Sequence, residues 1–571
     1  MNQPLRLASG ESLYADVRHI YGPLSPYLHA ALFHVFGPSL AVLYADGIVS
    51  AALALALVYW LARQMMSPLA AGTATLSVTW LCVFKPAGNY ILPYSYNALH
   101  GAVLGLVTVA VLVQVIRGST ADPLRAAPAR GLVAAGVAAA LTVLAKTEMG
   151  VAASAAGVAT AVLVAYPDSR RGLRLIAFFL APFALITVAV YGYLAWSVGW
   201  FVLVHDSWLL PYNVPPELAR YNQWIAGFDR PLTSLGRMLI ALAKLGALAA
   251  IIGAACTFLS GRRAGDRPAR GTGLFASPAR MLVAAVVLLL AMALTTGFDW
   301  DKGPYLAMPF LLAGLLRVLI LSLPTSVGDA ALRTRILIVC VVYALASLGR
   351  MILHARSGGA YGSYLLPLSV VLFTYLWAVP FPDWLERHGA RRLGGAIAVG
   401  LILLDVVITA GILAHRYRTR FPVAVTTDRG TMMAERDLGQ AWNEALDYIG
   451  DHTARGDAVA VMPEGTSLDF LSGRRNPLRE EITTPGYLDG PDEARAIRQL
   501  DAAQTSLVLI TNRPTSEFGP KAFGRDYATG VMRWIEANYE VCAMFGPVKD
   551  PRLQIGDRPF FIRAYCRRVG S

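Results

Sequence analysis

The sequence predicts a multi-pass α-helical membrane protein with a C-terminal extracytoplasmic α/β domain. Three observations lead to this fold class: an apolar composition, hydrophobic runs that recur through residues 1–415, and a change to short, strand-length runs from residue 416 onward. The 571 residues are 56% hydrophobic and 15% charged, whereas soluble domains carry about 25% charged residues. Such a chain is suited to lipid or to the interior of a helix bundle.

Twelve apolar runs approach the ~20 residues that a helix needs to cross a bilayer. They fall near residues 39–62, 69–84, 98–116, 131–145, 148–166, 174–196, 238–259, 280–297, 305–323, 335–352, 363–381 and 392–414. The run at 69–84 is short, and the two runs on either side of Lys146 are joined by a very short connection. We expect about twelve spans, with external loops at 1–37 and 199–237 that form short helices on the outer surface.

Loop arginines and lysines predict the orientation of these spans. Seventeen fall in one alternating set of loops and eight in the other, so the richer set is expected in the cytoplasm. Residues 1–37 and everything after 415 are then extracytoplasmic. Because residues 1–37 contain no apolar run to carry them across, we expect one more span upstream of Met1, thirteen in all. The net charge of +13 follows from the loop arginines, so no nucleic-acid partner is expected.

Residues 416–571 predict a soluble domain of alternating strands and helices. Strand-length runs at Ala458–Met462, Leu507–Thr511, Tyr539–Phe545 and Phe560–Tyr565 are separated by amphipathic helices near 438–452, 491–502 and 524–538. Cys542 and Cys566 lie on or beside the last two strands. An oxidising compartment would let them pair, and two unpaired buried thiols are the open alternative.

Polar side chains collect on the expected external face, where each is costly near lipid. They are Glu11, Asp16, His19, Tyr21, Tyr90, Tyr94, Asn97, Lys146, Asp299, Asp301, Arg350 and Arg356. Carboxylates hold hydroxyls or act as a base, and lysine and arginine bind phosphate. This combination predicts a sugar bound beside a lipid phosphate. The plainer alternative for many of these residues is that tyrosines anchor at the interface and cations reach toward lipid headgroups.

The segment GESLYADVRHIYGPLSPYLHAALFHVFG resembles the first external loop of GT-C class glycosyltransferases. It is most similar to bacterial relatives of protein O-mannosyltransferase and of the lipid A aminoarabinose transferase, through LY-x-D at 13–16 and GPL at 22–24. Tail segments such as VMPEGTSLDFLSGRRNP and FFIRAYCRR also look like the C-terminal domain of bacterial members. The resemblance implies an inverting transferase of the bacterial inner membrane. Its donor would be a polyprenyl-phosphate-linked sugar, and its acceptor an extracytoplasmic glycan, lipid or protein.

This resemblance implies roles for the external residues. Asp16 and Glu11 are the expected catalytic carboxylates. Donor phosphate is expected at Lys146, Arg350 and Arg356, and substrate at His19, Tyr21, Tyr90, Tyr94, Asn97, Asp299 and Asp301. In such relatives another acidic residue precedes LY-x-D, and its position here falls at or before Met1.

Other functions stay open at the level of sequence. The sequence also leaves open a divalent metal ion bound by Glu11, Asp16 and His19, although their spacing is not a metal signature. An alternative function is a transporter or flippase of lipid-linked saccharides, because such proteins place ionisable groups within the membrane. Asp46 and Asp405 lie in apolar runs in this way. A non-catalytic scaffold whose tail domain recruits a partner is the third possibility.

Overall fold

The structure is a computed structural model that describes residues 1–86, 88–121, 127–207, 214–260, 304–356, 359–388, 393–488 and 490–568. The chain divides into two compact units. Met1–Asp46, Ala189–Trp224 and Ala414–Ser571 form the first, which we call the loop–tail unit. Gly47–Val188 and Ile225–Leu413 form the second, which we call the helical unit.

Among the described residues, ten helices are long and apolar enough to cross a membrane, and Pro68–Val83 is a shorter apolar stretch. Eleven of the twelve predicted spans coincide with these segments, and the predicted span at 280–297 lies outside the described residues. The multi-pass helical fold is therefore confirmed. The helices involved are α3 (Leu40–Arg63), α4 (Pro68–Val78), α5 (Tyr96–Ala121), α6 (Ala127–Ala145), α7 (Thr147–Ala165), α8 (Ser169–Val198), α10 (Pro216–Ala226), α11 (Pro231–Ser260), α13 (Met308–Ser322), α14 (Gly328–Leu348), α16 (Pro367–Ala378), α17 (Pro380–Arg387) and α18 (Leu393–Arg420).

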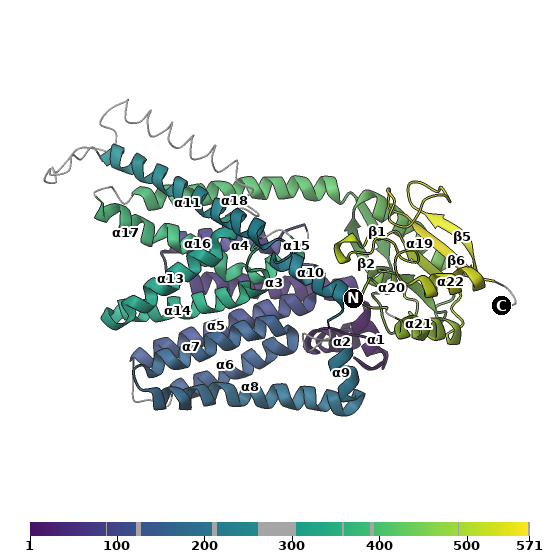
Figure 1. Ribbon diagram of the computed structural model, residues 1–571, viewed down its shortest axis with the longest axis horizontal. Coiled ribbons are helices and arrows are strands. Elements are labelled where there is room, and N and C mark those ends of the chain that lie inside the picture. The colour runs from purple at the N-terminus through teal and green to yellow at the C-terminus, as the bar shows by residue number, and fades with distance from the viewer. Residues whose placement is uncertain are drawn as a thin grey trace. The chain divides into compact units, whose positions relative to one another are not determined.

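Small residues let the helices of the helical unit pack closely. Helices α5, α6 and α7 run side by side (Figure 1). On α6, a Cβ at Gly136 would collide with the backbone oxygen of Phe179 in α8, and a Cβ at Gly157 on α7 would collide with the Phe179 ring. Small side chains at such contacts allow apolar helices to gain van der Waals packing in a lipid environment.

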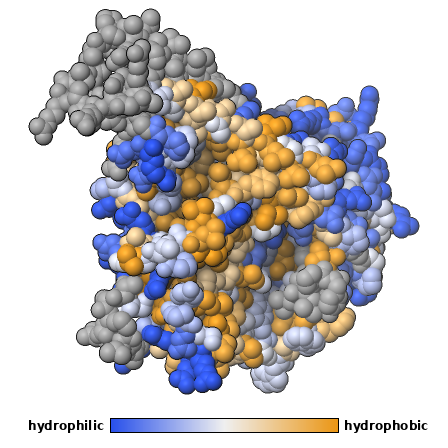
Figure 2. All heavy atoms as spheres, turned by 60° about the vertical axis from the view of Figure 1, so that its left-hand side comes forward, coloured by the Kyte–Doolittle hydropathy of each residue, from blue (hydrophilic) through white to orange (hydrophobic). Residues whose placement is uncertain are grey.

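The outer faces of the same helices are apolar. Figure 2 shows hydrophobic side chains gathered over the helical part of the molecule. Exposed hydrophobic side chains on these helices include Leu185 of α8, Val318 and Leu321 of α13, and Val407 of α18. Apolar surface on this scale suits contact with lipid rather than water.

Short helices form the parts of the loop–tail unit that precede the tail domain. They are α1 (Asn2–Ala8), α2 (Leu24–Phe36), α9 (Trp200–Asp206) and α10. Helices α1 and α2 lie within the predicted loop 1–37, and α9 and α10 lie within the predicted loop 199–237. Leu13 and Tyr14 of the first loop pack in one apolar cluster with Leu194 and Leu203.

The tail domain is built on a four-stranded sheet with the order β3-β4-β6-β5 (Figure 1). Its elements are β3 (Val459–Met462), β4 (Leu507–Thr511), β5 (Tyr539–Phe545), β6 (Ile562–Arg567), α19 (Arg436–His452), α20 (Thr466–Ser472), α21 (Pro491–Ala502) and α22 (Thr529–Asn538). Strand β3 pairs with β4 in parallel, and β6 runs antiparallel to β4 and β5. Helices α21 and α22 cover one face of the sheet and α19 the other. The predicted α/β pattern is confirmed.

Among the described residues of the tail, a hairpin and a short α-helix escaped sequence prediction. The hairpin consists of the antiparallel strands β1 (Val423–Thr427) and β2 (Gly430–Ala434), and the helix is α20. The hairpin strands alternate exposed and partly buried side chains, so they lack the continuous apolar run that marks strands buried on both faces.

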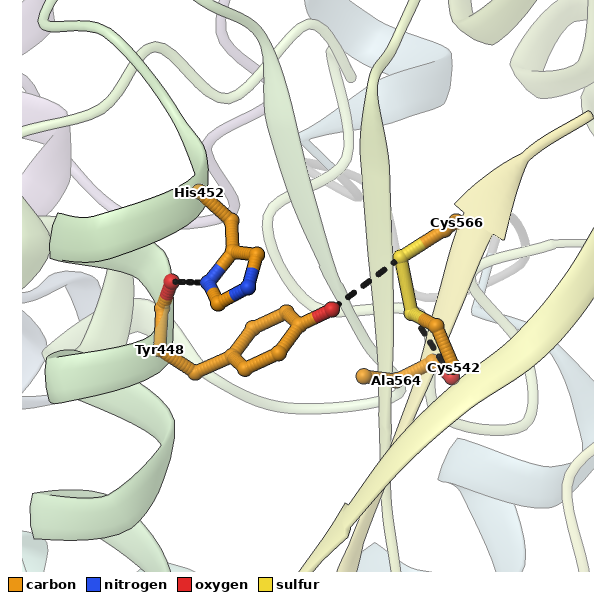
Figure 3. The surroundings of a disulfide bond; sticks show 5 residues. All are labelled: Tyr448, His452, Cys542, Ala564 and Cys566. Atoms are coloured by element: carbon orange, nitrogen blue, oxygen red, sulfur yellow. Dashed lines mark hydrogen bonds between the residues drawn. A yellow bond between two sulfur atoms is a disulfide. The ribbon is translucent and has the colours of Figure 1, made fainter. Parts of the chain in front are cut away.

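Cys542 and Cys566 form a disulfide between β5 and β6, which selects one of the two alternatives left open by the sequence (Figure 3). Cys542 is the extra residue of a bulge, because Val541 pairs with Tyr565 and Ala543 with Ala564. The hydroxyl of Tyr448, on α19, lies 3.4 Å from the Cys566 Sγ (Figure 3). The disulfide therefore fixes the register of β5, which lies at the edge of the sheet.

Candidate functional site

Ionised side chains meet in the helical unit where α6 ends and α7 begins. The Lys146 Nζ lies 3.5 Å, and the Arg350 Nη1 3.0 Å, from the same oxygen, Oε1 of Glu148. Tyr361, on α15 (Gly359–Leu365), faces both cations: the centre of its ring is 4.3 Å from the guanidinium carbon of Arg350 and 5.7 Å from the Lys146 Nζ. We call Lys146, Glu148, Arg350 and Tyr361 the cationic cluster.

The local fold explains why Lys146 turns inward. It is the single residue between α6 and α7, with an extended backbone, and its N–H still donates to the Thr142 carbonyl at 2.7 Å. Glu148 follows in the first turn of α7, where the helix dipole favours a negative charge. A Cβ at Gly101 on α5 would lie 2.7 Å from the Cβ of Lys146, so glycine there makes room for the lysine.

The cationic cluster is chemically suited to bind an anion. It contains two cations and one carboxylate, so it carries one net positive charge with an aromatic face beside both cations. Lysine and arginine form short, charge-assisted hydrogen bonds to phosphate oxygens. Glu148 pairs with both cations.

The other cations and aromatics predicted for this face differ in position. Tyr94 is 61% exposed and meets Tyr361 edge-on, with ring centres 6.5 Å apart. Asn97 donates to the carbonyl of Ala145, directly before Lys146, at 3.1 Å. Tyr94 and Asn97 therefore lie beside the cationic cluster. Arg356 is half-buried in the segment that follows η5 (Gly349–Met351).

Tyr90 packs in the interior of the helical unit. It is fully buried, stacks on Tyr364 with ring centres 5.4 Å apart, and donates its hydroxyl to the Ser363 carbonyl at 2.7 Å. The predicted substrate residues Asp299 and Asp301 lie outside the described residues.

The first-loop residues lie in the loop–tail unit, and their side chains are engaged locally. Glu11 forms an ion pair with Arg6, N to O 2.5 Å, and Asp16 accepts a hydrogen bond from its neighbour Ser12. The His19 Nδ1 lies 2.9 Å from the Gln3 Oε1. Tyr21 accepts the hydroxyl of Tyr14 on its carbonyl. Across the described part of the chain, Glu11, Asp16 and His19 do not converge as metal ligands.

A buried histidine–carboxylate pair in the loop–tail unit was not predicted from sequence. The His29 Nε2, on α2, lies 2.9 Å from the Asp46 Oδ2, on α3, and His29 stacks on Phe33. His29 is 2% exposed. The signal was present, because a histidine in an apolar helix and an aspartate in an apolar run both need a partner. Sequence alone did not show that the two meet.

The tail domain holds a pair of buried acids close to α1. Burial raises the pKa of the Asp469 carboxyl well above its usual range, and the nearby Glu481 carboxyl raises it further. Burial likewise raises the pKa of Glu481, an effect that Arg6 opposes from 3.7 Å. Hydrogen bonds from Asn476 to Asp469 and from Asn2 to Glu481 occupy the two acids. Arg6, which bonds Glu11, therefore also links the first loop to the tail domain.

Comparisons with known proteins give structural similarity only. No protein-family profile and no curated protein matches the sequence. The chain is similar to a crystal structure of the Archaeoglobus fulgidus oligosaccharyltransferase in complex with Zn and sulfate, at 15% identity and a TM-score of 0.48, over 99% of this chain and 68% of that one. It is also similar to ArnT from Cupriavidus metallidurans bound to undecaprenyl phosphate, at 13% identity and a TM-score of 0.36, over 98% and 92% of the two chains.

The oligosaccharyltransferase and ArnT are GT-C class glycosyltransferases, the class that the first loop resembles. Similarity at this level assigns no activity to this chain. The function proposed below therefore rests on the chain's own residues.

Proposed function

We propose that this chain is a membrane glycosyltransferase that moves a sugar from a polyprenyl-phosphate donor to an extracytoplasmic acceptor, with inversion at the sugar carbon. The observation that carries the proposal is the cationic cluster. It places a buried lysine and an arginine on either side of one carboxylate, at the junction of two helices of membrane-spanning length. Ionisable groups at such a place are expensive, and they usually serve a substrate.

The cluster's charges fit the chemistry of this donor. In the transfer, an acceptor oxygen forms a bond to the sugar C1 while the bond from C1 to the phosphate oxygen breaks, and the acceptor proton passes to a base. The lipid phosphate gains negative charge as it leaves. Lys146 and Arg350 would stabilise that charge by direct hydrogen bonds, and such preorganised donors are usually a large part of catalysis. Tyr94, beside the cluster, would offer an exposed aromatic face to the sugar.

The base is predicted to come from the first loop, where Glu11 and Asp16 are the candidates. A divalent ion is a further part of the proposal. His29 and Asp46 supply an imidazole nitrogen and a carboxylate oxygen 2.9 Å apart, and both are ligand types that Zn²⁺ accepts.

The disulfide supports an extracytoplasmic tail. Disulfides persist in oxidising compartments and are rare in the cytosol, which agrees with the orientation expected from loop arginines. A bacterial inner-membrane location with the tail in the periplasm is therefore part of the proposal. In spheroplasts, whose outer membrane has been removed, a membrane-impermeant protease should remove a C-terminal tag. A tag that stays protected until the spheroplasts are lysed would contradict this orientation.

The direct test is donor turnover by the purified chain in liposomes. A panel of undecaprenyl-phosphate sugars with a radiolabelled sugar is supplied, and sugar transfer and release of undecaprenyl phosphate are measured. Lys146→Gln and Arg350→Gln should each lower kcat/KM by about tenfold or more, because each removes one cation from the leaving phosphate. Lys85→Gln is the matched control. Lys85 is a buried lysine of the same unit that donates to the Ser363 hydroxyl and lies outside the cluster.

A transporter would give a different result in the same liposomes. Labelled donor would move between leaflets with its sugar bond intact, and no undecaprenyl phosphate would be released. That outcome, or transfer that is insensitive to both cluster substitutions, would refute the proposed function.

A further inference from the structure

The LY-x-D segment of the first loop forms a tight turn with an unusual backbone. Tyr14 has φ of 68°, the left-handed region that side-chain-bearing residues rarely adopt. Its N–H donates to the Val17 carbonyl at 2.8 Å, and Leu13 and Val17 form an isolated bridge. The Asp16 Oδ2 accepts the N–H of Ser12 at 2.8 Å, while the N–H of Asp16 donates to the Ser12 carbonyl. Asp16 therefore closes the turn through hydrogen bonds of its side chain and its backbone to Ser12.

The same turn occurs a second time, in the tail domain, at FGRDY. Gly524 has φ of 78°, its N–H donates to the Tyr527 carbonyl at 2.8 Å, and Phe523 bridges Tyr527. The Asp526 Oδ2 accepts the N–H of Ala522 at 3.0 Å, and the N–H of Asp526 donates to the Ala522 carbonyl. The four interactions named for the first-loop turn each have a counterpart here.

The second turn shows which features of the first-loop turn belong to the backbone turn itself rather than to a reaction. In both turns an aspartate stands at the fourth position and accepts a backbone N–H, which is a common use of aspartate in turns. The left-handed second position holds glycine in the tail, where no side chain opposes it, and tyrosine in the first loop. The first-loop turn thus needs support that the tail turn does not.

Arg479 of the tail domain supplies that support. Its Nε donates to the Ala15 carbonyl at 2.7 Å, and its Nη2 donates to the Tyr14 carbonyl, so one guanidinium holds two successive carbonyls of the turn. In return, the N–H of Arg18 donates to the Arg479 carbonyl at 2.9 Å. Arg479 is 6% exposed, and Glu480 balances its charge from 3.5 Å. Backbone conformations of this kind persist where the surroundings over-determine them.

The side chain of Tyr14 is fixed as firmly as its backbone. It is 1% exposed, packs with Leu194 and Leu203, and donates its hydroxyl to the Tyr21 carbonyl at 2.6 Å. Contacts from the tail domain, the first loop and the neighbouring helices thus all hold Tyr14.

We propose that LY-x-D is a structural turn clamped by Arg479, so that Asp16 and Arg479 are positioning residues that hold the first loop in its working shape. Asp16 acts through the N–H of Ser12 rather than as the base. Of the two carboxylates expected to be catalytic, Glu11 is then the one left for a chemical role. This inference rests on the proposed function only where transfer is the readout.

Asparagine and alanine at position 16 distinguish the two roles. The Asn oxygen still accepts the Ser12 N–H, so Asp16→Asn should keep the turn, whereas Asp16→Ala cannot. Hydrogen exchange of the full-length protein in detergent measures the turn without any activity. Asp16→Ala and Arg479→Ala should speed exchange across residues 12–18 by about tenfold or more, and Asp16→Asn by less than about threefold. Asp526→Ala and Asp526→Asn are the matched pair and should change residues 522–527 in the same pattern.

Transfer then tests the role in function. Asp16→Ala and Arg479→Ala should lower kcat by about tenfold or more, and Asp16→Asn should restore most of that loss with the pH dependence of kcat/KM unchanged. An equal loss with Asn and Ala, together with a lost acidic limb of the pH profile, would identify Asp16 as the base and overturn the inference. Unchanged exchange in Asp16→Ala would also overturn it. If the wild type shows no transfer, the proposed function fails, and the exchange result still decides the inference.

Discussion

Removing the Cys542–Cys566 disulfide should destabilise the tail domain by an amount that follows from the chain length it closes. The two cysteines are 24 residues apart. Closing a loop of this length lowers the entropy of the unfolded chain enough to stabilise the folded state by about 3.5 kcal/mol. The disulfide also fixes a bulge on the edge strand β5, so its loss should loosen β5 before the buried strands β3 and β4.

Pulse proteolysis of the full-length protein across a urea series measures this change. A tag on the C-terminus reports intact tail after a brief protease pulse at each concentration. With a urea dependence of about 2 kcal/mol per molar for a domain of this size, the midpoint of Cys542→Ser/Cys566→Ser should fall by about 1.5–2 M. Wild-type protein treated with a reductant should show the same shift.

Two cysteines outside the disulfide provide the control. Cys256 and Cys340 are buried in α11 and α14. Cys256→Ala/Cys340→Ala removes two sulfurs without removing a cross-link, so the tail midpoint should not move. A shift below about 0.5 M in the disulfide variant, with the wild type shown by thiol labelling to be oxidised, would refute the loop-entropy reasoning.

Three further changes test other parts of the structure. Asp469→Asn should flatten the pH dependence of tail stability. The pKa of Asp469 is raised in the folded state, so its contribution to stability is present at acidic pH and is lost as the pH rises through the folded pKa. The loss is about 1.4 kcal/mol for each tenfold difference in proton affinity between the folded and unfolded states. Urea midpoints at pH 5 and pH 8 measure this loss. Gly101→Ala should displace Lys146 and weaken undecaprenyl phosphate binding, whereas Gly118→Ala, with open space on the same helix, should not; lipid titrations compare them. Phe470→Ala should lower the free energy of tail unfolding by about 3–5 kcal/mol, since the ring is fully buried, and the urea series tests this value.

Helix positions could be predicted from sequence because a spanning helix is recognisable by composition alone. The predicted tail strands and helices followed for the same reason, since β4 is apolar at most positions and buried on both faces. The β1–β2 hairpin escaped prediction because its stability comes from packing: a Cβ at Gly439 on α19 would collide with the side chain of Val423. Packing between segments leaves no periodic signal in either segment.

The cationic cluster could be predicted in part from the charges of the loop residues. Lys146 and Arg350 were predicted to lie on one face from loop order, and the structure joins Arg350 to Glu148 across 202 residues of sequence. The contribution of Tyr361 beside both cations was not assigned, because an aromatic residue near a helix end is equally typical of an interfacial anchor. The residue types of the cluster were predictable, whereas their partners were not, and the side of the membrane stays a prediction.

In the first loop, a chemical and a structural interpretation of the same residue compete. Ionisable residues clustered at a membrane favour a chemical interpretation, and Asp16 drew it because it completes a recognisable motif. Yet the contact that gives the motif its shape, from Arg479 to Tyr14, joins residues 465 positions apart and is invisible along the chain. A second turn with the same hydrogen bonds and no motif attached, at Phe523–Tyr527, shows that an aspartate in this place is sufficiently explained by the backbone it closes.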